Sequence, residues 1–489
     1  MPIQFMKSTL VSFPRQNCTP SRQPLLLKER SSVPFIIFVV SFAIFTDTFL
    51  YGLVVPVLPN ALNERVHISS SDEQKWTSIL LALYAGGTFI FGPITGCLSD
   101  QFKSRWWPMI AGALVQGTGT ALLCTGTSIG LWIAGRILQG AATSVIWTVA
   151  NALLVDTVGD ERIGHAMGYV GASMSIGTLA GPLVGGAVYE HAGYYTVFAV
   201  AFAVIGVDVV LRLVVIEKKD ASRYLNPSAH SAELPTGSNP KCADNKVSSI
   251  ELEPTDETQP QHRPSPHTTL AAAYTLLCSP RTLVALWGTI VKSINGSAWN
   301  SVLPLFVRDA YGWAQTAQGL IFIPFILPYI LSPLVGCVND RNPRMRRFLG
   351  AGSLLLSVPA WVLLRLVSVN DIGHKVLLCA LLAWLGFCMT ILSPLVLAEA
   401  SYAATEKAKQ EPSKSGEQGP IGLAYGFENS AFAVGSIAGP FLAGSVRETA
   451  GWDTMTWVLG LLNGVSAIPV LLMLGGLRIP WMDDERRVS

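Results

Sequence analysis

The sequence contains few charged residues. Asp, Glu, Lys and Arg make up 13% of its 489 residues, about half the share that a soluble domain carries. Because hydrophobic residues make up 50% of the chain and the mean hydropathy is +0.43, an ordinary soluble globular protein is excluded. The formal net charge is only +2, so the total charge gives no sign of a nucleic-acid partner.

The sequence also lacks the motifs of phosphate, metal and nucleophile chemistry. No glycine-rich loop ends in Gly-Lys-Ser or Gly-Lys-Thr, which argues against nucleotide binding. The eight cysteines show no Cys-x-x-Cys or metal-type spacing. No nucleophile, histidine and carboxylate combine on a stretch that reads as a soluble domain. We therefore expect no enzyme activity, no catalytic residue, no cofactor and no metal site.

Long apolar stretches dominate what the sequence does contain. Each is close to the roughly 20 residues that a helix needs to cross a bilayer. Twelve can be marked, at 33–59, 76–98, 107–126, 130–154, 165–189, 194–216, 282–306, 314–338, 348–368, 374–398, 421–446 and 454–477. They predict an all-α membrane protein with twelve transmembrane helices in two pseudo-symmetric bundles of six.

Polar segments divide the chain and predict its orientation. A gap rich in Ser, Pro, Thr and acidic residues has no apolar period until its end, which is typical of a disordered linker. Most of the 34 lysines and arginines fall on the side of this linker and of both termini, which predicts that side to be cytoplasmic. The expected division is an N-terminal tail (1–32), a first bundle (33–216), the linker (217–281), a second bundle (282–477) and a C-terminal tail (478–489).

A pattern of glycine and proline occurs twice along the chain. The fifth apolar stretch contains Gly168, Gly177, Gly181-Pro182 and Gly185-Gly186, and the eleventh contains Gly426, Gly435, Gly439-Pro440 and Ala443-Gly444. Within a membrane, the missing side chains let a neighbouring helix approach closely. The repeat predicts two copies of one membrane unit, and it predicts that the glycine-rich helices form close crossings or hinges.

A second repeated segment ends the second and eighth stretches. Gly96 and Asp100 lie in the first copy, and Gly336 and Asp340, followed by Arg341, lie in the second. A carboxylate at a helix end can accept hydrogen bonds from the N-terminus of a neighbouring helix or pair with an arginine. We predict that these residues latch the cytoplasmic side in one conformation. The alternative is a solvated carboxylate in a positively charged loop.

These features resemble the major facilitator superfamily over all twelve stretches. The segment from Gly96 to Asp100 is similar to the family's loop between helices two and three. The stretch from Gly168 to Gly186 is similar, position for position, to the fifth-helix motif of the drug:proton antiporter branch. The resemblance implies alternating access and efflux in exchange for protons, whereas a close helix crossing alone would fit any transporter.

Two charged residues inside the first six stretches are candidate sites, because a charge within the bilayer is costly unless it is paired or reaches water. Arg136 with Gly140 resembles the family's Arg-x-x-x-Gly motif, which is tied to proton transfer in proton-coupled members. Asp47 lies about midway along the first stretch, which resembles that of vesicular amine transporters, where the carboxylate meets the substrate's ammonium. The alternatives are an arginine that satisfies backbone carbonyls and an aspartate in a structural ion pair.

The second half contributes further candidates. Lys292 lies at the position equivalent to Asp47, on one helical face with Asn300. Asp47 and Lys292 are therefore predicted either to pair across a central cavity or to hold opposite ends of a substrate. Glu428, in the eleventh stretch, is a further proton-site candidate, whereas Glu399 reads as an interfacial charge.

The expected function is secondary transport. We expect the protein to export an amphipathic or cationic small organic molecule, such as a drug or secondary metabolite, in exchange for protons. The alternatives are a vacuolar or vesicular amine/proton antiporter and, from another class, a non-transporting membrane receptor. The expected partners are the substrate, protons and the lipid bilayer, without nucleotide or nucleic acid. The plasma membrane is the expected location, with a vacuolar or vesicular membrane as the alternative.

Overall fold

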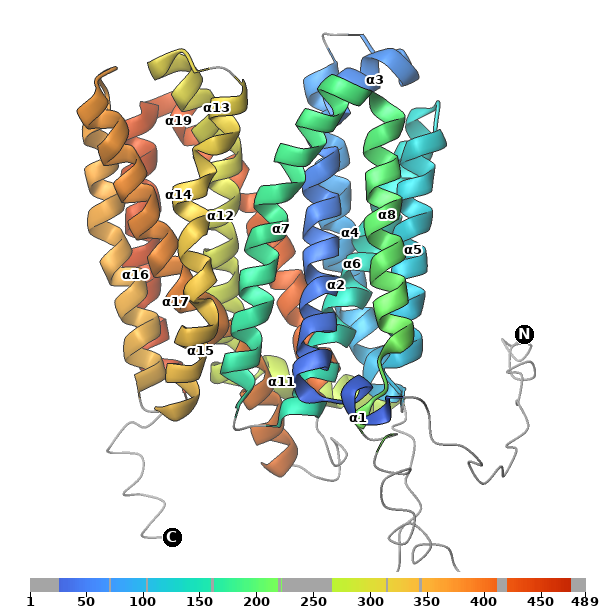
Figure 1. Cartoon of the computed structure of the whole chain (residues 1–489). Helices are drawn as coiled ribbons and strands as arrows, with labels where there is room; N and C mark the ends of the chain where they lie inside the picture. The colour runs from blue at the N-terminus through green and yellow to red at the C-terminus, as the bar shows by residue number, and fades with distance from the viewer. Residues whose placement is uncertain are drawn as a thin grey trace, which may run out of the picture.

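The computed structural model describes residues 26–69, 72–102, 104–159, 162–218, 221, 266–313, 315–342, 345–410 and 420–475. Every regular element among these residues is a helix. Figure 1 shows the long helices standing side by side in two groups, one formed before and one formed after the central gap in the chain.

The first group follows the short helix α1 (Leu27–Arg30). It contains α2 (Val33–Val54), α3 (Leu58–Val66), α4 (Glu73–Gln101), α5 (Trp106–Thr125), α6 (Ile129–Val158), α7 (Ile163–Ala192) and α8 (Tyr194–Val214). We call the end of the molecule that carries α1 the inner side, which the charge distribution predicts to be cytoplasmic, and the opposite end the outer side.

The second group follows α11 (Pro266–Leu277), which also lies at the inner side (Figure 1). It contains α12 (Pro280–Tyr311), α13 (Gln315–Leu320), α14 (Phe322–Ile326), η2 (Leu327–Leu331), α15 (Ser332–Arg341), α16 (Arg346–Leu363), η4 (Leu364–Leu366), α17 (Ile372–Gln410) and α19 (Ile421–Met473).

Nine helical segments within the described ranges are long and apolar enough to cross a membrane. Their outward faces carry exposed apolar side chains, such as Ile90, Leu114 and Val210, each close to 60% exposed. Exposed apolar surface on this scale is unfavourable in water but suits contact with lipid tails. A helix satisfies all its own backbone hydrogen bonds, which lets it cross the bilayer.

Two of the apolar stretches do not form single straight helices. The stretch at 314–338 is divided into α13, α14, η2 and α15, and Pro328 and Pro333 each lie in the first turn of a new element. Proline has no amide hydrogen and clashes with the preceding turn, so it starts a helix more readily than it continues one. The stretch at 33–59 is likewise divided into α2 and α3. The long α19 instead joins the stretches at 421–446 and 454–477 across a bend at Gly451, whose φ of 85° favours glycine.

The predicted linker at 217–281 is structured at both of its ends. Glu217 Oε1 accepts hydrogen bonds from Ser104 Oγ (2.7 Å) and from the Trp106 amide (2.8 Å) at the start of α5. The other end forms α11, which buries Leu276 completely. Most of the linker (219–220 and 222–265) lies outside the described residues, as do residues 411–419 and the chain ends at 1–25 and 476–489.

Buried apolar side chains form three clusters. One lies within the second group and one lies at the outer end of the first group. The third lies toward the inner side and is shared by both groups: Ile36 and Leu153 of the first group belong to the same cluster as Leu397 and Tyr425 of the second. The apolar contact between the groups therefore concentrates on the inner side.

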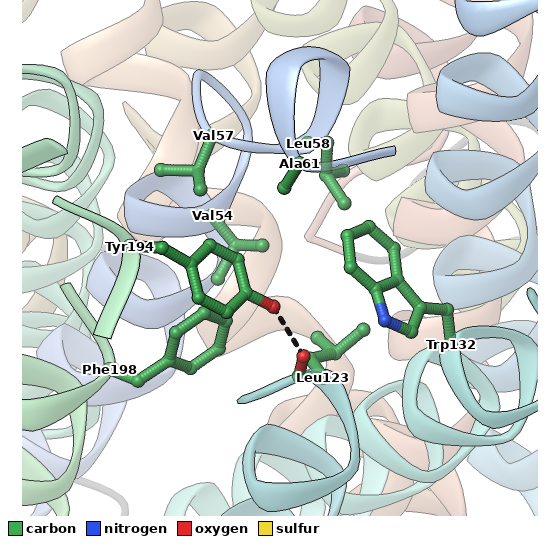
Figure 2. Close-up of a pocket in the computed structure, with 8 residues that line it drawn as sticks. All are labelled: Val54, Val57, Leu58, Ala61, Leu123, Trp132, Tyr194 and Phe198. Carbon is green, nitrogen blue, oxygen red and sulfur yellow. Dashed lines mark hydrogen bonds between the residues drawn. The ribbon is translucent and has the colours of Figure 1, made fainter. Parts of the chain in front are cut away.

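A small apolar gap lies at the outer end of the first group. Figure 2 shows its lining, in which the Tyr194 hydroxyl donates a hydrogen bond of 2.5 Å to the Leu123 carbonyl oxygen beside Trp132 and Phe198. The gap has no room for a water molecule, so it is a packing defect and not a binding site.

The repeated glycines seat one helix directly on another. An added Cβ at Gly177, Gly181 or Gly185 of α7 would strike the Thr48 side chain or the Phe49 and Leu53 carbonyl oxygens of α2. Gly435 and Gly439 of α19 lie in the same way against α12. The later glycines of each copy therefore fix a helix pair within one group.

The first glycine of each copy contacts the other group. An added Cβ at Gly168 would strike Pro333 of α15, and one at Gly426 would strike the Gly92 carbonyl oxygen of α4. Pro182 contacts Gly52 of α2, whereas Gly186 has no heavy atom within 4 Å of an added Cβ. Both α7 and α19 thus contact the opposite group with their inner ends and their own group with their outer ends.

Replacing Gly181 by Ala should destabilise the protein, because the new methyl group meets the backbone of α2 at Phe49 and Gly52. Overpacking of this kind costs about 1–3 kcal/mol. Gly186→Ala in the same helix is the matched control and should leave stability unchanged. The free energy of unfolding in a detergent titration measures both variants, and equal values for the two would contradict this packing.

Candidate functional site

A cavity lies between the two groups of helices. The first group contributes Trp147 of α6 and Met174 of α7. The second group contributes side chains from α12, α17 and α19, namely Thr289, Lys292, Leu397, Glu428, Asn429 and Phe432. Its free volume of about 20 Å³ accommodates a water molecule but no organic molecule. An organic molecule would fit there only if the two groups moved apart.

The cavity contains one acidic and one basic side chain, both almost fully buried. Glu428 is 3% exposed and Lys292 is 7% exposed. Thr289 Oγ1 donates a hydrogen bond of 2.7 Å to Glu428 Oε1, while Glu428 Oε2 has no partner among the described residues. Lys292 Nζ donates a long hydrogen bond of 3.4 Å to Ser393 Oγ. Both groups therefore retain hydrogen-bonding capacity that this conformation does not use.

Asp47 lies outside the cavity and does not meet Lys292. Its oxygens accept hydrogen bonds from Thr143 Oγ1 (2.7 Å), Trp147 Nε1 (2.9 Å) and Gln116 Nε2 (3.5 Å). The structure therefore brings Lys292 together with Glu428, and it places Asp47 behind the Trp147 side chain. Asn300, which was predicted to share the face of Lys292, is exposed and does not line the cavity.

Arg136 is fully buried and only partly hydrogen-bonded. Its Nη1 donates a hydrogen bond of 3.3 Å to Gln139 Oε1 on the same helix. Its Nε and Nη2 have no hydrogen-bond partner within the described ranges. Its one hydrogen bond goes to a side-chain amide and none goes to a backbone carbonyl. Arg136 is thus a second buried charge whose hydrogen bonding is incomplete.

Polar side chains of α19 also bond the first group. Asn429 Nδ2 donates a hydrogen bond of 3.0 Å to Thr148 Oγ1 of α6. Ser430 Oγ donates one of 2.9 Å to the Phe89 carbonyl oxygen of α4. Neither residue was singled out as a site from the sequence. Their signal there was that they follow Glu428 directly in an otherwise apolar stretch.

Each repeated aspartate binds the first turn of a helix in the opposite group. Asp100 accepts hydrogen bonds from the amides of Gly422 (2.7 Å) and Leu423 (2.9 Å) at the start of α19. Asp340 accepts 2.8 Å hydrogen bonds from the amides of Gly164 and His165 at the start of α7. A carboxylate is favourable there because the unpaired amides and the helix dipole present positive charge.

Gly96 and Gly336 make these contacts possible. An added Cβ at Gly96 would strike the Gly422 carbonyl oxygen, and one at Gly336 would strike the Gly164 carbonyl oxygen. Each glycine lies one helical turn before its aspartate. The backbones of the two helices therefore touch close to the amides that the carboxylate binds.

Different side chains support the two aspartates. Arg105 Nη2 lies 3.9 Å from Asp100 Oδ1, and Arg105 Nε lies 3.1 Å from Asp156 Oδ2. At the second copy, the Tyr402 hydroxyl donates a hydrogen bond of 3.2 Å to Asp340 Oδ1. The Arg346 guanidinium lies 4.0 Å from the centre of the Tyr402 ring. An arginine therefore lies near each aspartate. Arg105 contacts Asp100 directly, whereas Arg346 contacts the Tyr402 ring.

Arg341, the arginine predicted to belong to the second latch, is exposed. It forms no ion pair with any residue that the structure describes, whereas Arg346 is 8% exposed. The sequence carried a signal for Arg346, because Arg105 follows Asp100 by nearly the same number of residues. Arg341 was favoured only because it follows Asp340 directly.

Other buried charges are paired within one group. Asp208 and Arg212 form an ion pair of 2.6 Å on α8. Glu399, predicted to be an interfacial charge, is instead 1% exposed. It pairs with Arg281 of α12 and accepts a 2.9 Å hydrogen bond from the Gly475 amide. Within the described ranges, no group of three His, Cys, Asp or Glu side chains is placed to hold a metal ion.

The chain belongs to the Major Facilitator Superfamily, whose model matches residues 40–410. Members of this family are membrane transporters and not enzymes. The protein is therefore a multi-pass membrane transporter.

Relatives with named roles support this assignment. An uncharacterised MFS-type transporter of Schizosaccharomyces pombe is 31% identical over 90% of this chain and 95% of its own length. The class C tetracycline resistance protein of Escherichia coli is 25% identical over 86% of this chain and 92% of its own length. The crystal structure of the human organic anion transporter MFSD10 has the same fold, with a TM-score of 0.62 at 17% identity, over 92% of this chain and 100% of that one.

Replacing Asp340 by Asn should loosen the contact between α15 and α7, because the amide group loses the charge that the start of α7 attracts. An interaction of this kind contributes about 0.3–2 kcal/mol, which corresponds to a change of about two- to thirty-fold. The measurement is the rate at which maleimide labels Ser332→Cys in a chain without other cysteines, since Ser332 is fully buried at this contact.

Arg346→Gln should also accelerate labelling, because it removes the cation from the Tyr402 ring. Arg341→Gln is the matched control and should leave the rate unchanged. Equal labelling rates for Asp340→Asn and for the chain that retains Asp340 would show that the aspartate does not hold the two groups together.

Proposed function

We propose that the protein is a twelve-helix secondary transporter that exports an amphipathic or cationic small organic molecule in exchange for protons. The observation that supports this most directly is the cavity between the two groups, in which Glu428 and Lys292 are buried with unused hydrogen-bonding capacity. A charge that is incompletely compensated within a membrane is a functional site by default.

The twelve proposed spans include helices that length and hydropathy alone do not single out. Within the part of the chain that the structure describes, nine helical segments pass that test. α5 and α12 are long enough to cross but more polar, and α19 divides into two arms at Gly451. Counting α5 and α12 and dividing α19 gives twelve, with six before and six after the central linker.

Alternating access follows from where the two groups touch. The latches of Asp100 and Asp340 and the shared apolar cluster all lie toward the inner side. Breaking them separates the inner ends of the groups and opens the cavity toward the cytoplasm. Re-forming them closes this path, so the substrate leaves toward the outer side.

Proton exchange is assigned to Glu428. When the cavity faces the cytoplasm, the carboxyl releases its proton and its carboxylate binds the cationic part of the substrate. When the cavity faces outward, a proton replaces the substrate on the same carboxylate and returns with it to the inside. Lys292 opposes any cation at Glu428, which helps the substrate to leave. Arg136, buried in α6 without a carboxylate partner among the described residues, is a second candidate in this exchange.

The named role of a relative supports the direction of transport. The Escherichia coli protein similar over most of its length is a tetracycline resistance protein, and resistance fits removal of a compound from the cell. We propose the plasma membrane as the site of action. A fluorescently tagged chain found in the vacuolar membrane would instead indicate that the same exchange loads an organelle.

Purified full-length protein in proteoliposomes with an imposed pH gradient tests the exchange. Tetracycline and a panel of amphipathic amines, zwitterions and organic anions are added, and proton movement is followed with a pH-sensitive dye. We expect at least one amphipathic or cationic compound to drive proton flux. No flux with any compound would overturn the proposed antiport.

Glu428→Gln should reduce substrate-driven proton flux by at least about ten-fold, because an amide cannot carry the exchanged proton. Glu448→Gln is the matched control, since it removes an exposed carboxylate from the same helix. Flux through Glu428→Gln equal to that of the control would assign the proton to another group.

A further inference from the structure

We propose that Asp47 is a positioning residue for Trp147, and that Trp147 and Phe432 form an aromatic wall that selects substrates with a planar aromatic ring. This inference rests on the proposed function, because it concerns the specificity of the same cavity. It gives Asp47 a role different from the direct contact with the substrate that the sequence predicted.

The first argument is that both Asp47 oxygens are already used. Oδ1 accepts hydrogen bonds from Thr143 Oγ1 and Gln116 Nε2, and Oδ2 accepts one from Trp147 Nε1. The Thr143 hydroxyl also lies 2.8 Å from the Tyr84 hydroxyl, which extends the network to α4. Asp47 is 1% exposed, so reaching a substrate would require it to give up these hydrogen bonds.

The second argument is that Trp147 reaches the cavity and Asp47 does not. Trp147 is 9% exposed and lines the cavity from the first group. Its indole is anchored by one polar atom, Nε1, and the acceptor of that hydrogen bond is Asp47. A buried indole N–H needs an acceptor, so the carboxylate determines how the ring is turned toward the cavity.

The third argument is the geometry of the facing ring. The Trp147 ring is nearly parallel to the Phe432 ring of the second group, with an interplanar angle of 18° and centroids 6.3 Å apart. Carbon atoms in contact lie about 3.5–4.0 Å apart, so a ring placed between two parallel rings needs a separation of about 7–8 Å. The ring centroids are closer than this separation, so one group must move away from the other before a planar ring fits between them.

The rest of the cavity suits such a molecule. Met174 also lines it, and a methionine side chain adapts its shape and contacts ring edges favourably. Glu428 and Lys292 lie in the same cavity for the polar part of the substrate. Aromatic selection and charge recognition thus come from different residues.

The carboxylate at position 47 differs from an amide in a specific way. Three donors point at Asp47, from Thr143, Trp147 and Gln116. An asparagine would place its own NH₂ group against one of them, which leaves two donors facing each other. Asp47→Asn should therefore release or turn the indole while keeping nearly the same side-chain volume.

The orientation of Trp147 can be measured without any substrate. The full-length protein is labelled with 5-fluorotryptophan, and Trp147→Phe identifies the fluorine resonance of Trp147. Asp47→Asn should shift this resonance and leave that of Trp299 unchanged, because Trp299 is stacked on Trp361 in the other group. An unchanged Trp147 resonance would overturn the positioning role.

Selection is measured by binding of two matched cations, tetraphenylphosphonium and tetrabutylphosphonium, to the purified protein. We expect the aromatic cation to bind at least about ten-fold more tightly than the aliphatic one, and Asp47→Asn to remove most of this preference. Equal binding of the two, or binding of neither, would overturn aromatic selection. The proposed antiport fails on a different result, namely the absence of proton flux across the whole substrate panel.

A double-variant experiment separates an effect through Trp147 from an independent one. In the Trp147→Phe background there is no indole N–H, so Asp47→Asn should cause no further loss of binding. In the Trp132→Phe background the loss should remain complete, because Trp132 lies on the same helix but donates its N–H to Gly126. Losses that multiply in the Trp147→Phe background would show that Asp47 acts on its own.

Discussion

A charge buried among apolar helices must be compensated, and the way this protein meets that requirement determines which of its charges hold the structure and which are free to change partner. Asp208 and Arg212 compensate each other's charge in an ion pair on one helix, although Asp208 Oδ1 and Arg212 Nε have no hydrogen-bond partner among the described residues. Asp47 is surrounded by neutral donors. Lys292, Glu428 and Arg136 are left with unused donors or acceptors. Unused hydrogen-bonding capacity without an ion pair among the described residues, more than burial itself, distinguishes these three candidates from Asp47 and from the Asp208–Arg212 pair.

The two halves repeat the same contacts with different chemistry. Asp100 and Asp340 each bind the first turn of a helix in the opposite group, and a glycine one turn earlier lets the backbones meet. In the first copy, Arg105 contacts the Asp100 carboxylate. In the second, Arg346 lies over the Tyr402 ring, and the Tyr402 hydroxyl contacts the Asp340 carboxylate. The second latch therefore depends on a neutral hydroxyl, and the two closures of the inner side differ in their electrostatics.

The sequence predicted the helices better than it predicted the partners of side chains. Hydropathy and the repeat located the long helices, because burial in lipid restricts composition over some twenty residues. The break at Pro328 and Pro333 was missed, since a membrane helix tolerates proline and its effect depends on the neighbours. The bend at Gly451 falls between the predicted stretches at 421–446 and 454–477. Asp47 and Lys292 do not pair in this structure, which was one of the two predicted alternatives, because equal depth in two bundles does not specify which way a side chain turns.

The division of α7 between two sets of contacts has a mechanical consequence. Its inner end is attached to α15 through Asp340, and its outer half lies on α2 with backbone against backbone at Gly181 and Gly185. Because no side chains separate the two helices there, α2 and α7 cannot slide past each other easily. We expect them to move together as one rigid body. Displacing the inner end of α7 would then tilt α2, the helix that carries Asp47, so a movement at the inner side would reach the contact between Asp47 and Trp147 without any change in the charges between them.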